Sequence, residues 1–355
     1  MTRILLVAGA RPNFMKVAPI LAELDRRGVD SVLVHTGQHY DPAMSDVFFE
    51  ELGIRPPDHH LEVGSASHAV QTARIMEAFE PVVLEEAPDW VVVVGDVNST
   101  VACSLVAAKL QIAVAHVEAG LRSRDWSMPE EVNRLVTDRL SQLLLAPSPD
   151  AVENLLAEGY PDDIIVLAGN VMVDTMLMNL DRALARPIRR DLGLDDGAYG
   201  LVTLHRPSNV DVRSVLEGLL EGIGTVAQDL PLVFPVHPRV RRALAEVDVP
   251  SEIRLIDPVG YLDSIALQAR ARLVLTDSGG VQEETTVLGV PCLTLRENTE
   301  RPITVTEGTN QVVGTRPERI VAAARRVLTD PPAPRRPELW DGQARVRIVD
   351  ALLTH

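Results

Sequence analysis

The sequence predicts an α/β protein with two consecutive doubly wound, Rossmann-like domains, and three observations support this. Short runs rich in β-branched residues alternate with longer helical segments, which is typical of parallel strands joined by helices. The run at residues 91–94 is apolar at every position, as expected for a strand buried on both faces. The chain has 355 residues, against ~150 for a usual domain, and the alternation pauses around residues 169–190.

In the first domain we expect strands at residues 3–8, 31–36, 90–94, 113–117 and 143–146. Its helices are predicted at residues 13–27, 45–52, 68–87, 99–110, 129–142 and 149–158. Gly28 should end the first helix, and Asn98 or Ser99 should cap the helix after residue 94.

In the second domain we expect strands at residues 200–204, 231–235, 253–256, 272–276 and 290–295. Its helices are predicted at residues 212–228, 239–246, 261–270, 281–288 and 318–328. We therefore predict an N-terminal domain at residues 1–170 and a C-terminal domain at 171–335. A last helix at 336–355 is expected to pack back on the N-terminal domain.

The composition excludes several classes of protein. A net charge of −16 argues against a protein that binds nucleic acid by bulk charge. Hydrophobic residues make up 46% of the chain, which excludes wholesale disorder, and no apolar run approaches the ~18 residues of a membrane span. Cys103 and Cys292 lie far apart, so we expect neither a disulfide framework nor a thiolate metal site, and we expect a cytoplasmic protein.

Ligands of doubly wound sheets bind beyond the carboxyl ends of the strands, so charged residues at these positions are candidates for a site. Arg11 and Lys16 flank the start of the first predicted helix, where cations and the helix N-terminus favour an anion. The spacing is not G-x-G-x-x-G, so the dinucleotide fingerprint is absent. An ordinary turn with two surface cations would also fit these residues.

Carboxylates collect at other strand ends of the first domain. Asp96 follows the strand at 90–94, and Glu118 follows the strand at 113–117. Glu130 and Glu131 lie in the first turn of a helix that begins with a proline, where the helix dipole alone also favours acids. Several carboxylates on one wall can supply acid and base groups of differing pKa, so we predict acid/base chemistry here.

Two strands of the second domain end in a histidine. His205 and Arg206 follow the strand at 200–204, and His237 follows the strand at 231–235. Such residues bind phosphate or transfer a proton, although a lone histidine is usually structural.

The strongest local signal is a strand that leads into Ser278, Gly279 and Gly280 at the start of a helix. The glycines allow backbone amides to approach an oxyanion, which predicts a phosphate site without a P-loop lysine. Glu284, one turn into the helix, can accept ribose hydroxyls, and Arg301 adds positive charge after the next strand.

The chain resembles the non-hydrolysing UDP-N-acetylglucosamine 2-epimerases. The resemblance rests on nine motifs in order: A-R-P-N-F-M-K, T-G-Q-H-Y, G-D, H-V-E-A-G-L-R-S, P-E-E-V-N-R, H-R-P-S-N, P-V-H-P, T-D-S-G-G-V-Q-E-E and E-R-P. It implies the glycosyltransferase-B architecture, with the active site in the interdomain cleft and the nucleotide held mainly by the C-terminal domain. It also implies a cytoplasmic homodimer that acts on a UDP-sugar and needs neither metal nor NAD.

The resemblance further implies a route and the residues for it. UDP is eliminated to give 2-acetamidoglucal and then added back, with the proton returned on the other face. The implied acid/base residues are Asp96, Glu118, Glu130 and His205. The implied UDP-binding residues are Arg11, Lys16, His205, Ser278, Gly279, Gly280, Glu284 and Arg301.

The substrate and its regulation stay open. Some bacterial members bind a second UDP-N-acetylglucosamine as activator through Gln-His-Arg-x-Met, where this chain has Gln-His-Tyr. The candidate allosteric or substrate-side residues are Gln38, His39, Arg74, Arg206 and His237. T-G-Q-H-Y-D also resembles epimerases of UDP-2,3-diacetamido-2,3-dideoxyglucuronate. The acid/base set disfavours two further functions, a glycosyltransferase on the same fold and a non-catalytic UDP-sugar sensor.

Overall fold

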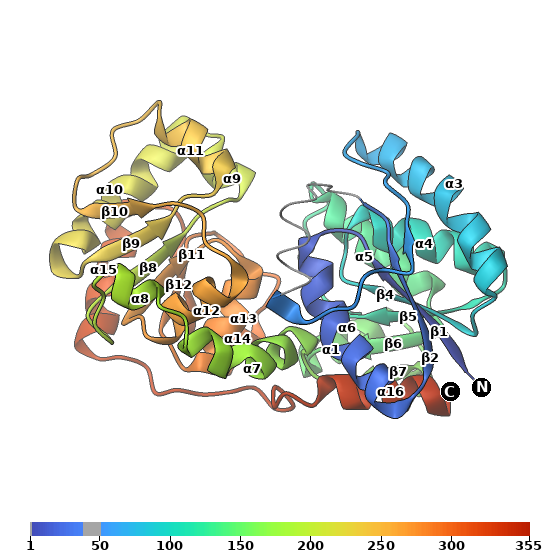
Figure 1. Ribbon diagram of the computed structural model, residues 1–355. Helices are drawn as coiled ribbons and strands as arrows, with labels where there is room; N and C mark the ends of the chain where they lie inside the picture. Colours follow the sequence, from blue (N-terminus) through green and yellow to red (C-terminus); the bar gives the residue numbers. More distant parts are fainter. Residues whose placement is uncertain (1, 38–50) are drawn as a thin grey trace. The chain divides into compact units, whose positions relative to one another are not determined.

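The computed structural model describes residues 2–37 and 51–355. The chain forms two compact units, one of Met1–Leu177 with Glu338–His355 and the other of Met178–Pro337. Each unit has its own parallel sheet with helices on both faces, which confirms the prediction of two doubly wound domains (Figure 1). None of the helices in these ranges is long and apolar enough to cross a membrane.

The described part of the first unit contains a seven-stranded sheet in the order β3-β2-β1-β4-β5-β6-β7. Its strands are β1 (Arg3–Ala8), β2 (Asp30–His35), β3 (His59–His60), β4 (Trp90–Val94), β5 (Ala113–Val117), β6 (Leu143–Ala146) and β7 (Ile165–Leu167). The strand order reverses between β1 and β4, which pair in parallel. Sheets of this kind bind ligands at the carboxyl ends of the strands at this switch point.

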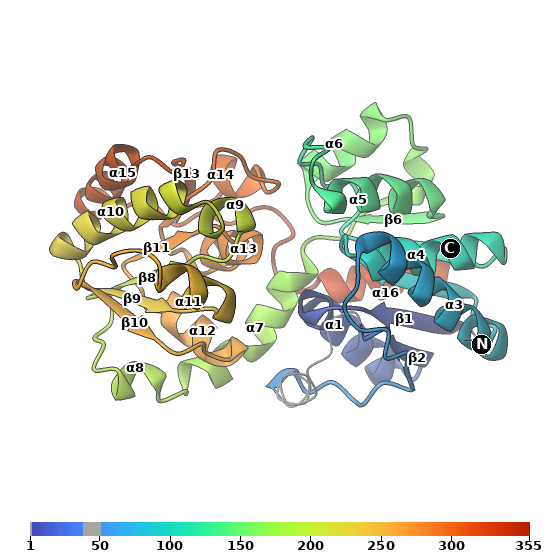
Figure 2. The same cartoon turned by 90° about the horizontal axis from the view of Figure 1, so that it is seen from above.

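The two faces of the first sheet are covered by different helices. Ile4 and Leu6 of β1 pack on one side with α1 (Arg11–Arg27) and α16 (Ala344–Thr354), while Leu5 packs on the other side with α3 and α4. Figure 2 shows α3 and α4 lying together beside the sheet. The remaining elements of this unit are α3 (His68–Glu86), α4 (Asn98–Lys109), α5 (Pro129–Leu140), α6 (Pro149–Ala157) and a 3-10 helix (Asp162–Ile164).

The second unit repeats the same topology with six parallel strands, in the order β10-β9-β8-β11-β12-β13. Its strands are β8 (Gly200–Thr203), β9 (Leu232–Pro235), β10 (Ile253–Ile256), β11 (Leu273–Thr276), β12 (Cys292–Thr294) and β13 (Asn310–Val312). The strand order reverses between β8 and β11. This second switch point corresponds to the one between β1 and β4.

Helices cover both faces of the second sheet as well. One face packs against α10 and α15, and the other packs against α8, α12 and α13. The elements are α8 (Ile188–Asp191), α9 (Pro207–Val210), α10 (Arg213–Asp229), α11 (Pro238–Leu244), α12 (Tyr261–Ala269), α13 (Gly279–Leu288), α14 (Ile303–Thr306) and α15 (Pro317–Thr329).

The alternation of strands and helices does pause at residues 169–190, because α7 (Val171–Leu184) and α8 follow one another there with no strand between them, but neither helix was predicted. The boundary between the units falls inside α7. The segment begins with Val171 and Val173, β-branched residues that weaken the helical signal in the sequence.

Two expected helix starts are also shifted. The first helix begins at Arg11 and not at residue 13, because Pro12 fits the first turn, where no backbone N–H is needed. Val97 is the N-cap of α4, so Asn98 and Ser99 lie inside this helix. Gly28 ends α1 in the left-handed conformation, as predicted. Most of the helix predicted at residues 45–52 lies outside the described residues.

Candidate active site

The turn after β1 is held by one buried amide. Asn13 accepts hydrogen bonds from the backbone N–H of Gly9 (3.1 Å) and of Ala10 (2.9 Å), and it donates to the Val94 carbonyl at the end of β4 (3.1 Å). The two strands at the switch point are therefore joined beyond their carboxyl ends. Arg11 begins α1 at this place, but its side chain lies outside the described residues, and its role stays a prediction.

Lys16 and Glu118 form a buried ion pair beside this turn. The Nζ of Lys16 contacts Oε2 of Glu118, and the side chains are only 10% and 3% exposed. Within the described residues, Oε1 of Glu118 is buried and has no hydrogen-bond partner. Glu118 also has φ +70°, a strained conformation that is frequent at functional sites. These features favour a chemical role for Glu118, which stays a prediction.

Gly95 makes room for this pair. A Cβ atom added at residue 95 would lie 2.6 Å from Lys16 Nζ and 3.5 Å from Glu118 Oε2. Gly95 also has φ +66°, which favours glycine. The glycine at the end of β4 is therefore required by both the backbone and the Lys16–Glu118 pair.

Asp96 is held by two neighbouring residues of α5. Arg134 Nη2 lies 2.7 Å from Asp96 Oδ2, and Asn133 donates its amide N–H to the Asp96 carbonyl at 2.9 Å. The Asp96 side chain is 25% exposed, whereas that of Arg134 is 4% exposed. The carboxylate is thus oriented by a buried cation and remains accessible.

The structure separates the roles of the two acids at the start of α5. Glu131 is buried and accepts hydrogen bonds from Ser123 N, Ser123 Oγ and Arg124 N, each at 2.9 Å. Burial alone would raise the pKa of Glu131, but these bonds and the charge of Arg134 hold it below its ordinary value. Glu131 therefore anchors the loop before α5, while Glu130 is half-buried.

Asp96 and Glu130 line one pocket of the first unit, with a volume of about 300 Å³. Its wall contains a chain of amides, in which Asn133 donates to Asn98 (3.3 Å) and Asn98 donates to Gln71 (2.8 Å). The full lining is Ser65, Ala66, His68, Gln71, Asp96, Val97, Asn98, Pro129, Glu130 and Asn133. Two of the predicted acid/base residues are thus brought together, in a pocket rich in hydrogen-bonding groups.

The fully buried His116 of β5 contacts the carbonyl oxygen of Gly95, the residue before Asp96. Its Nδ1 is 2.6 Å from Asp138 Oδ1, and Asp138 Oδ2 is 2.7 Å from Arg122 Nη2. Burial alone would raise the pKa of Asp138, but the facing His116 and Arg122 hold it below its ordinary value. Sequence reasoning missed Arg134 and Asp138, although their i,i+4 spacing on a helix with other polar residues at 133 and 137 is a usable signal.

In the second unit, the fully buried Asp277 after β11 shapes the loop that follows β8. Its carboxylate accepts the backbone N–H groups of His205 (3.1 Å) and Arg206 (2.9 Å) and lies 3.2 Å from His205 Nδ1. Burial opposes ionisation, yet the contacts with His205 and Arg206 hold the pKa of Asp277 below its ordinary value. Asp277 was not singled out from the sequence, although it stands inside the T-D-S-G-G motif.

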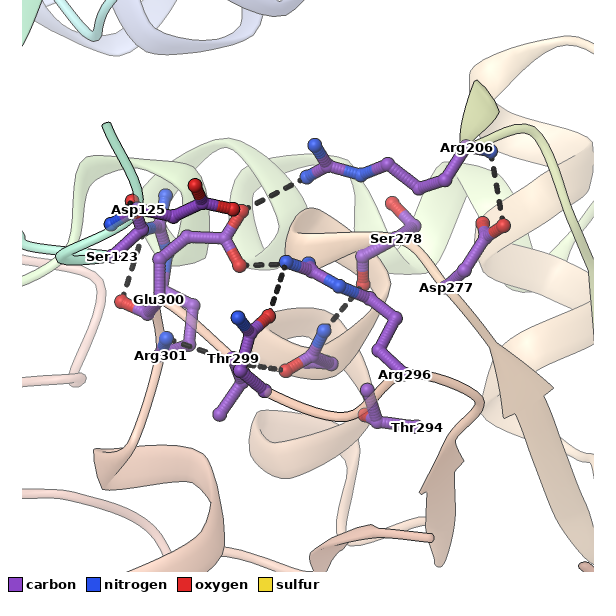
Figure 3. A network of polar contacts seen from close by, with 12 residues as sticks. Ser123, Asp125, Arg206, Asp277, Ser278, Thr294, Arg296, Thr299, Glu300 and Arg301 are labelled. Atoms are coloured by element: carbon purple, nitrogen blue, oxygen red, sulfur yellow. Dashed lines mark hydrogen bonds and ion pairs between the residues drawn. The ribbon is translucent and has the colours of Figure 1, made fainter. Parts of the chain in front are cut away.

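The Ser-Gly-Gly turn follows Asp277 and opens α13 as predicted (Figure 3). Ser278 is the N-cap residue, but its side chain makes no capping hydrogen bond. Its backbone N–H donates to Thr276 Oγ1 instead, at 3.0 Å. A Cβ atom added at Gly279 would have no neighbouring atom within 4 Å, so open space lies beside the start of the helix.

Glu284 is buried in the next turn of α13, where its Oε2 accepts a hydrogen bond from Gln268 at 2.7 Å. Burial and, to a smaller extent, the neighbouring Glu283 raise the pKa of Glu284 to about 7, against the effect of the Gln268 bond. A carboxyl group with this pKa changes its protonation easily near neutral pH.

Arginines surround Glu300 in the loop after β12 (Figure 3). Arg206 Nη2 lies 2.9 Å from Glu300 Oε1, and Arg296 Nη1 lies 2.7 Å from Glu300 Oε2. Burial would raise the pKa of Glu300, but the arginine charges lower it to about 2. Arg301 is itself buried and pairs through Nε with Glu283 at 2.6 Å. Arg301 thus adds charge from a fixed position.

The candidate allosteric residues are divided between the two units, and two of them cannot be placed. Gln38 and His39 lie outside the described residues. Arg74 is exposed on α3, and Arg206 pairs with Glu300. His237 lines a separate pocket of about 740 Å³ in the second unit. Within residues 2–37 and 51–355, no group of three or more His, Cys, Asp or Glu side chains is arranged to hold a metal ion.

Comparisons with known proteins give the chain its relatives. The family model described as UDP-N-acetylglucosamine 2-epimerase matches residues 22–353. The chain is 44% identical to the UDP-N-acetylglucosamine 2-epimerase of Methanocaldococcus jannaschii, with 91% of each chain covered. It is 43% identical to the UDP-2,3-diacetamido-2,3-dideoxy-D-glucuronate 2-epimerase of Pseudomonas aeruginosa, with 92% of each covered.

Solved structures agree with these relatives. The crystal structure of Methanocaldococcus jannaschii UDP-GlcNAc 2-epimerase in complex with UDP-GlcNAc and UDP matches with a TM-score of 0.92 at 41% identity, and both chains are covered completely. Phytolacca americana UGT2, at a TM-score of 0.61 and 12% identity, is similar in fold alone. The likeness confirms the predicted glycosyltransferase-B fold class.

Proposed function

The chain belongs to the UDP-N-acetylglucosamine 2-epimerase family, a family of isomerases, and we propose that it interconverts UDP-N-acetylglucosamine and UDP-N-acetylmannosamine. One observation carries the proposal: Asp96 and Glu130 line one pocket at the first switch point, while Oε2 of Glu118 lies 3.5 Å from a Cβ atom added at Gly95, the residue before Asp96. A site that moves a proton between two faces of a sugar needs several carboxylates in one place.

The proposed chemistry is the elimination implied by the family resemblance. A base removes the proton at carbon 2, the bond from carbon 1 to the UDP oxygen breaks, and UDP leaves with the electron pair. UDP then adds back to the resulting 2-acetamidoglucal, and a proton returns to carbon 2 on the opposite face. We assign this proton transfer and the charge stabilisation at carbon 1 to Asp96, Glu118, Glu130 and His205.

We assign UDP binding to residues that lie at the switch points of the two sheets. The start of α13 at Ser278, Gly279 and Gly280 has open space beside it and suits the diphosphate, because helix N-termini favour anions. Glu284 suits the ribose hydroxyls. The cations of the set are Arg11, Lys16, His205 and Arg301.

Lys16 connects the two sets of residues. Its Nζ pairs with Glu118, so its charge stabilises the carboxylate when UDP is absent. A diphosphate that develops negative charge on leaving would compete for the same ammonium group. Lys16 would thus link the leaving diphosphate to the carboxylate of Glu118.

A second substrate is favoured by one comparison. The relative named for UDP-2,3-diacetamido-2,3-dideoxy-D-glucuronate is 43% identical, almost the same as the UDP-N-acetylglucosamine 2-epimerase at 44%. His68, which lines the pocket with Asp96 and Glu130, offers a group that can carry positive charge near a uronate. We therefore propose this sugar as the alternative substrate.

The test is to incubate the enzyme in heavy water with each UDP-sugar and to follow carbon 2 by proton NMR while the products are separated by chromatography. We expect loss of the carbon-2 proton signal and the appearance of a second epimer with UDP-N-acetylglucosamine. The same result with the diacetamido uronate alone would favour that sugar as the substrate. Absence of exchange and of a second epimer with both sugars would refute the proposed activity.

We also propose a homodimer, as the family resemblance implies. Light scattering after size-exclusion chromatography should give twice the mass of the chain, and a concentration-independent monomer mass would contradict this.

A further inference from the structure

The side chain of His116 connects helix α5 to the strand end that presents Asp96. His116 is fully buried on β5, with Nε2 2.8 Å from the carbonyl oxygen of Gly95 and Nδ1 2.6 Å from Asp138 Oδ1. Gly95 is the residue before Asp96, and its own N–H donates to the Val117 carbonyl at 3.0 Å. Both polar groups of the Gly95 backbone are therefore bound to β5.

These contacts define the protonation of the ring. A carbonyl oxygen can only accept a hydrogen bond, so Nε2 must carry a proton. Asp138 faces Arg122 and the N–H of Gly120, contacts that keep it ionised, so Nδ1 must carry a proton as well. His116 is thus a buried imidazolium whose two N–H groups have one acceptor each.

Three side chains of α5 converge on the Gly95–Asp96 segment. Arg134 binds the Asp96 carboxylate at 2.7 Å, and Asn133 binds the Asp96 carbonyl at 2.9 Å. Asp138 acts one step further away, through the ring of His116, on the Gly95 carbonyl. The carboxylate, its carbonyl and the preceding carbonyl are therefore all held from one helix.

We propose that His116 is a positioning residue for Asp96: by fixing the Gly95 carbonyl it sets the plane of the Gly95–Asp96 peptide and hence the direction of the carboxylate. The inference rests on the proposed function, in which Asp96 transfers a proton or stabilises charge. A displacement of about 1 Å at a reacting group can lower a rate ~100-fold, so loss of this hydrogen bond should act on turnover.

The hydrogen bond from His116 to the Gly95 carbonyl can be tested separately from the charge of the His116 ring. In Asp138→Asn, the amide oxygen can still accept from Arg122 and Gly120, and the amide N–H can donate to Nδ1 of a neutral His116. Nε2 would still donate to Gly95. This variant should therefore keep kcat within about threefold of wild type, although the ring loses its charge.

His116→Phe removes the hydrogen bond to Gly95. We expect kcat to fall about 100-fold while KM changes less than about threefold, because UDP binding does not involve His116. His116→Gln can place an amide N–H near the Gly95 carbonyl, so it should recover about tenfold over His116→Phe. The control is Leu144→Ala, a buried position opposite His116 on β6, which loosens the same part of the sheet without touching Gly95.

Each outcome has a distinct meaning. If His116→Phe and Leu144→Ala lose kcat equally at matched melting temperatures, the residue is merely structural and the inference is wrong. If His116→Phe keeps wild-type kcat while Asp96→Asn is inactive, the inference fails but the proposed function stands. If the wild-type enzyme shows no exchange at carbon 2, the proposed function itself fails. Nitrogen-15 NMR of the ring should show two protonated nitrogens in wild type and only Nε2 protonated in Asp138→Asn, and an unprotonated Nε2 in wild type would also overturn the inference.

Discussion

Carboxylates lie beyond corresponding strands in both units, but they bind different groups. In the first unit, Glu118 contacts a lysine and Asp96 contacts an arginine, and one oxygen of Glu118 has no partner among the described residues. In the second unit, Asp277 accepts backbone N–H groups with both oxygens, and Glu300 contacts an arginine with each oxygen.

This difference shows how one topology supports two tasks. A carboxylate that keeps an unpartnered oxygen, as Glu118 does, or partial exposure, as Asp96 does, can still take up a proton or meet a substrate. A carboxylate saturated by N–H and guanidinium donors is held ionised, so it shapes the loops that carry cations and amides toward an anion. The acids of the first unit would therefore react, and those of the second would support the site.

The largest effect should come from the acids of the first unit. We expect Asp96→Asn and Glu118→Gln each to lower kcat by about 10³- to 10⁴-fold, because each removes a group assigned to proton transfer or charge stabilisation. UDP affinity, measured by calorimetry, should change less than about threefold in Asp96→Asn and should rise in Glu118→Gln, which frees Lys16 for the diphosphate. Asp89→Asn is the matched control, because Asp89 stands at the opposite end of β4, where it accepts the N–H of Arg3. Near-full activity of Glu118→Gln would contradict the view that the acids of the first unit react.

Gly95→Ala tests the Lys16–Glu118 pair by filling the space that Gly95 leaves beside it. The new Cβ would meet Lys16 Nζ at 2.6 Å, so the Lys16–Glu118 pair must separate, and we expect kcat to fall about 10- to 100-fold. Gly28→Ala is the control, because Gly28 has the same φ of +66° and no atom within 4 Å of an added Cβ. Because of the positive φ, Gly28→Ala should lower the free energy of unfolding by a similar amount, about 1 kcal/mol. It should keep full activity. Equal kinetics of the two variants would show that the pair is not needed.

Asp277→Asn tests the supporting role in the second unit. Loss of the charge that orients His205 and Arg206 should weaken UDP binding about tenfold and lower the free energy of unfolding by about 1–3 kcal/mol. Asp174→Asn is a matched control in the first unit, since Asp174 accepts the backbone N–H groups of Ala344 and Arg345. That variant should lose stability and keep UDP affinity. Wild-type UDP affinity in Asp277→Asn would refute the supporting role.

Glu284 is an acid of α13 for which burial dominates, and its effect is on the pH dependence of stability and of UDP binding. Its pKa is raised from 4.5 to about 7, so the folded chain keeps a proton that the unfolded chain has released between these pH values. The free energy of unfolding should therefore fall as pH rises from 4.5 to 7, by at most ~3 kcal/mol. Urea unfolding at several pH values should show this slope in wild type and its loss in Glu284→Gln.

The exposed Glu252 gives the control for this measurement, because Glu252→Gln should keep the wild-type slope. Hydroxyl donors of a ribose would stabilise the ionised form of Glu284, so UDP affinity should also rise with pH through this range. An unchanged slope in Glu284→Gln would show that another group titrates.

The elements with a clear pattern were predicted well. β1, β4, β5, β6 and β10 have the predicted bounds, because each is a short and mostly apolar run between turn residues. The three-residue strands β7 and β13 were not predicted, since so short a run cannot show a period of two. The helix α7 was missed where valines begin an amphipathic segment.

The candidate site was predicted as a set of residues but not as a set of contacts. Strand ends and turn glycines identified Asp96, Glu118 and Ser278, because the topology places them at a known edge of the sheet. Residue type and helix position did not distinguish the adjacent Glu130 and Glu131, and only the family resemblance selected Glu130. The structure does so, because Glu131 reaches the N–H groups of Ser123 and Arg124 while Glu130 lines the pocket.

The sequence by itself determined the fold class, the two units and the family, since these follow from periodicity and from motifs that are local in the chain. Tertiary structure alone decided which charges meet. Lys16 and Glu118 are separated by 102 positions, and His116 and Asp138 by 22. These pairs form because parallel strands bring distant segments to one edge of a sheet, where burial strengthens each ionic contact and makes an unpaired charge costly.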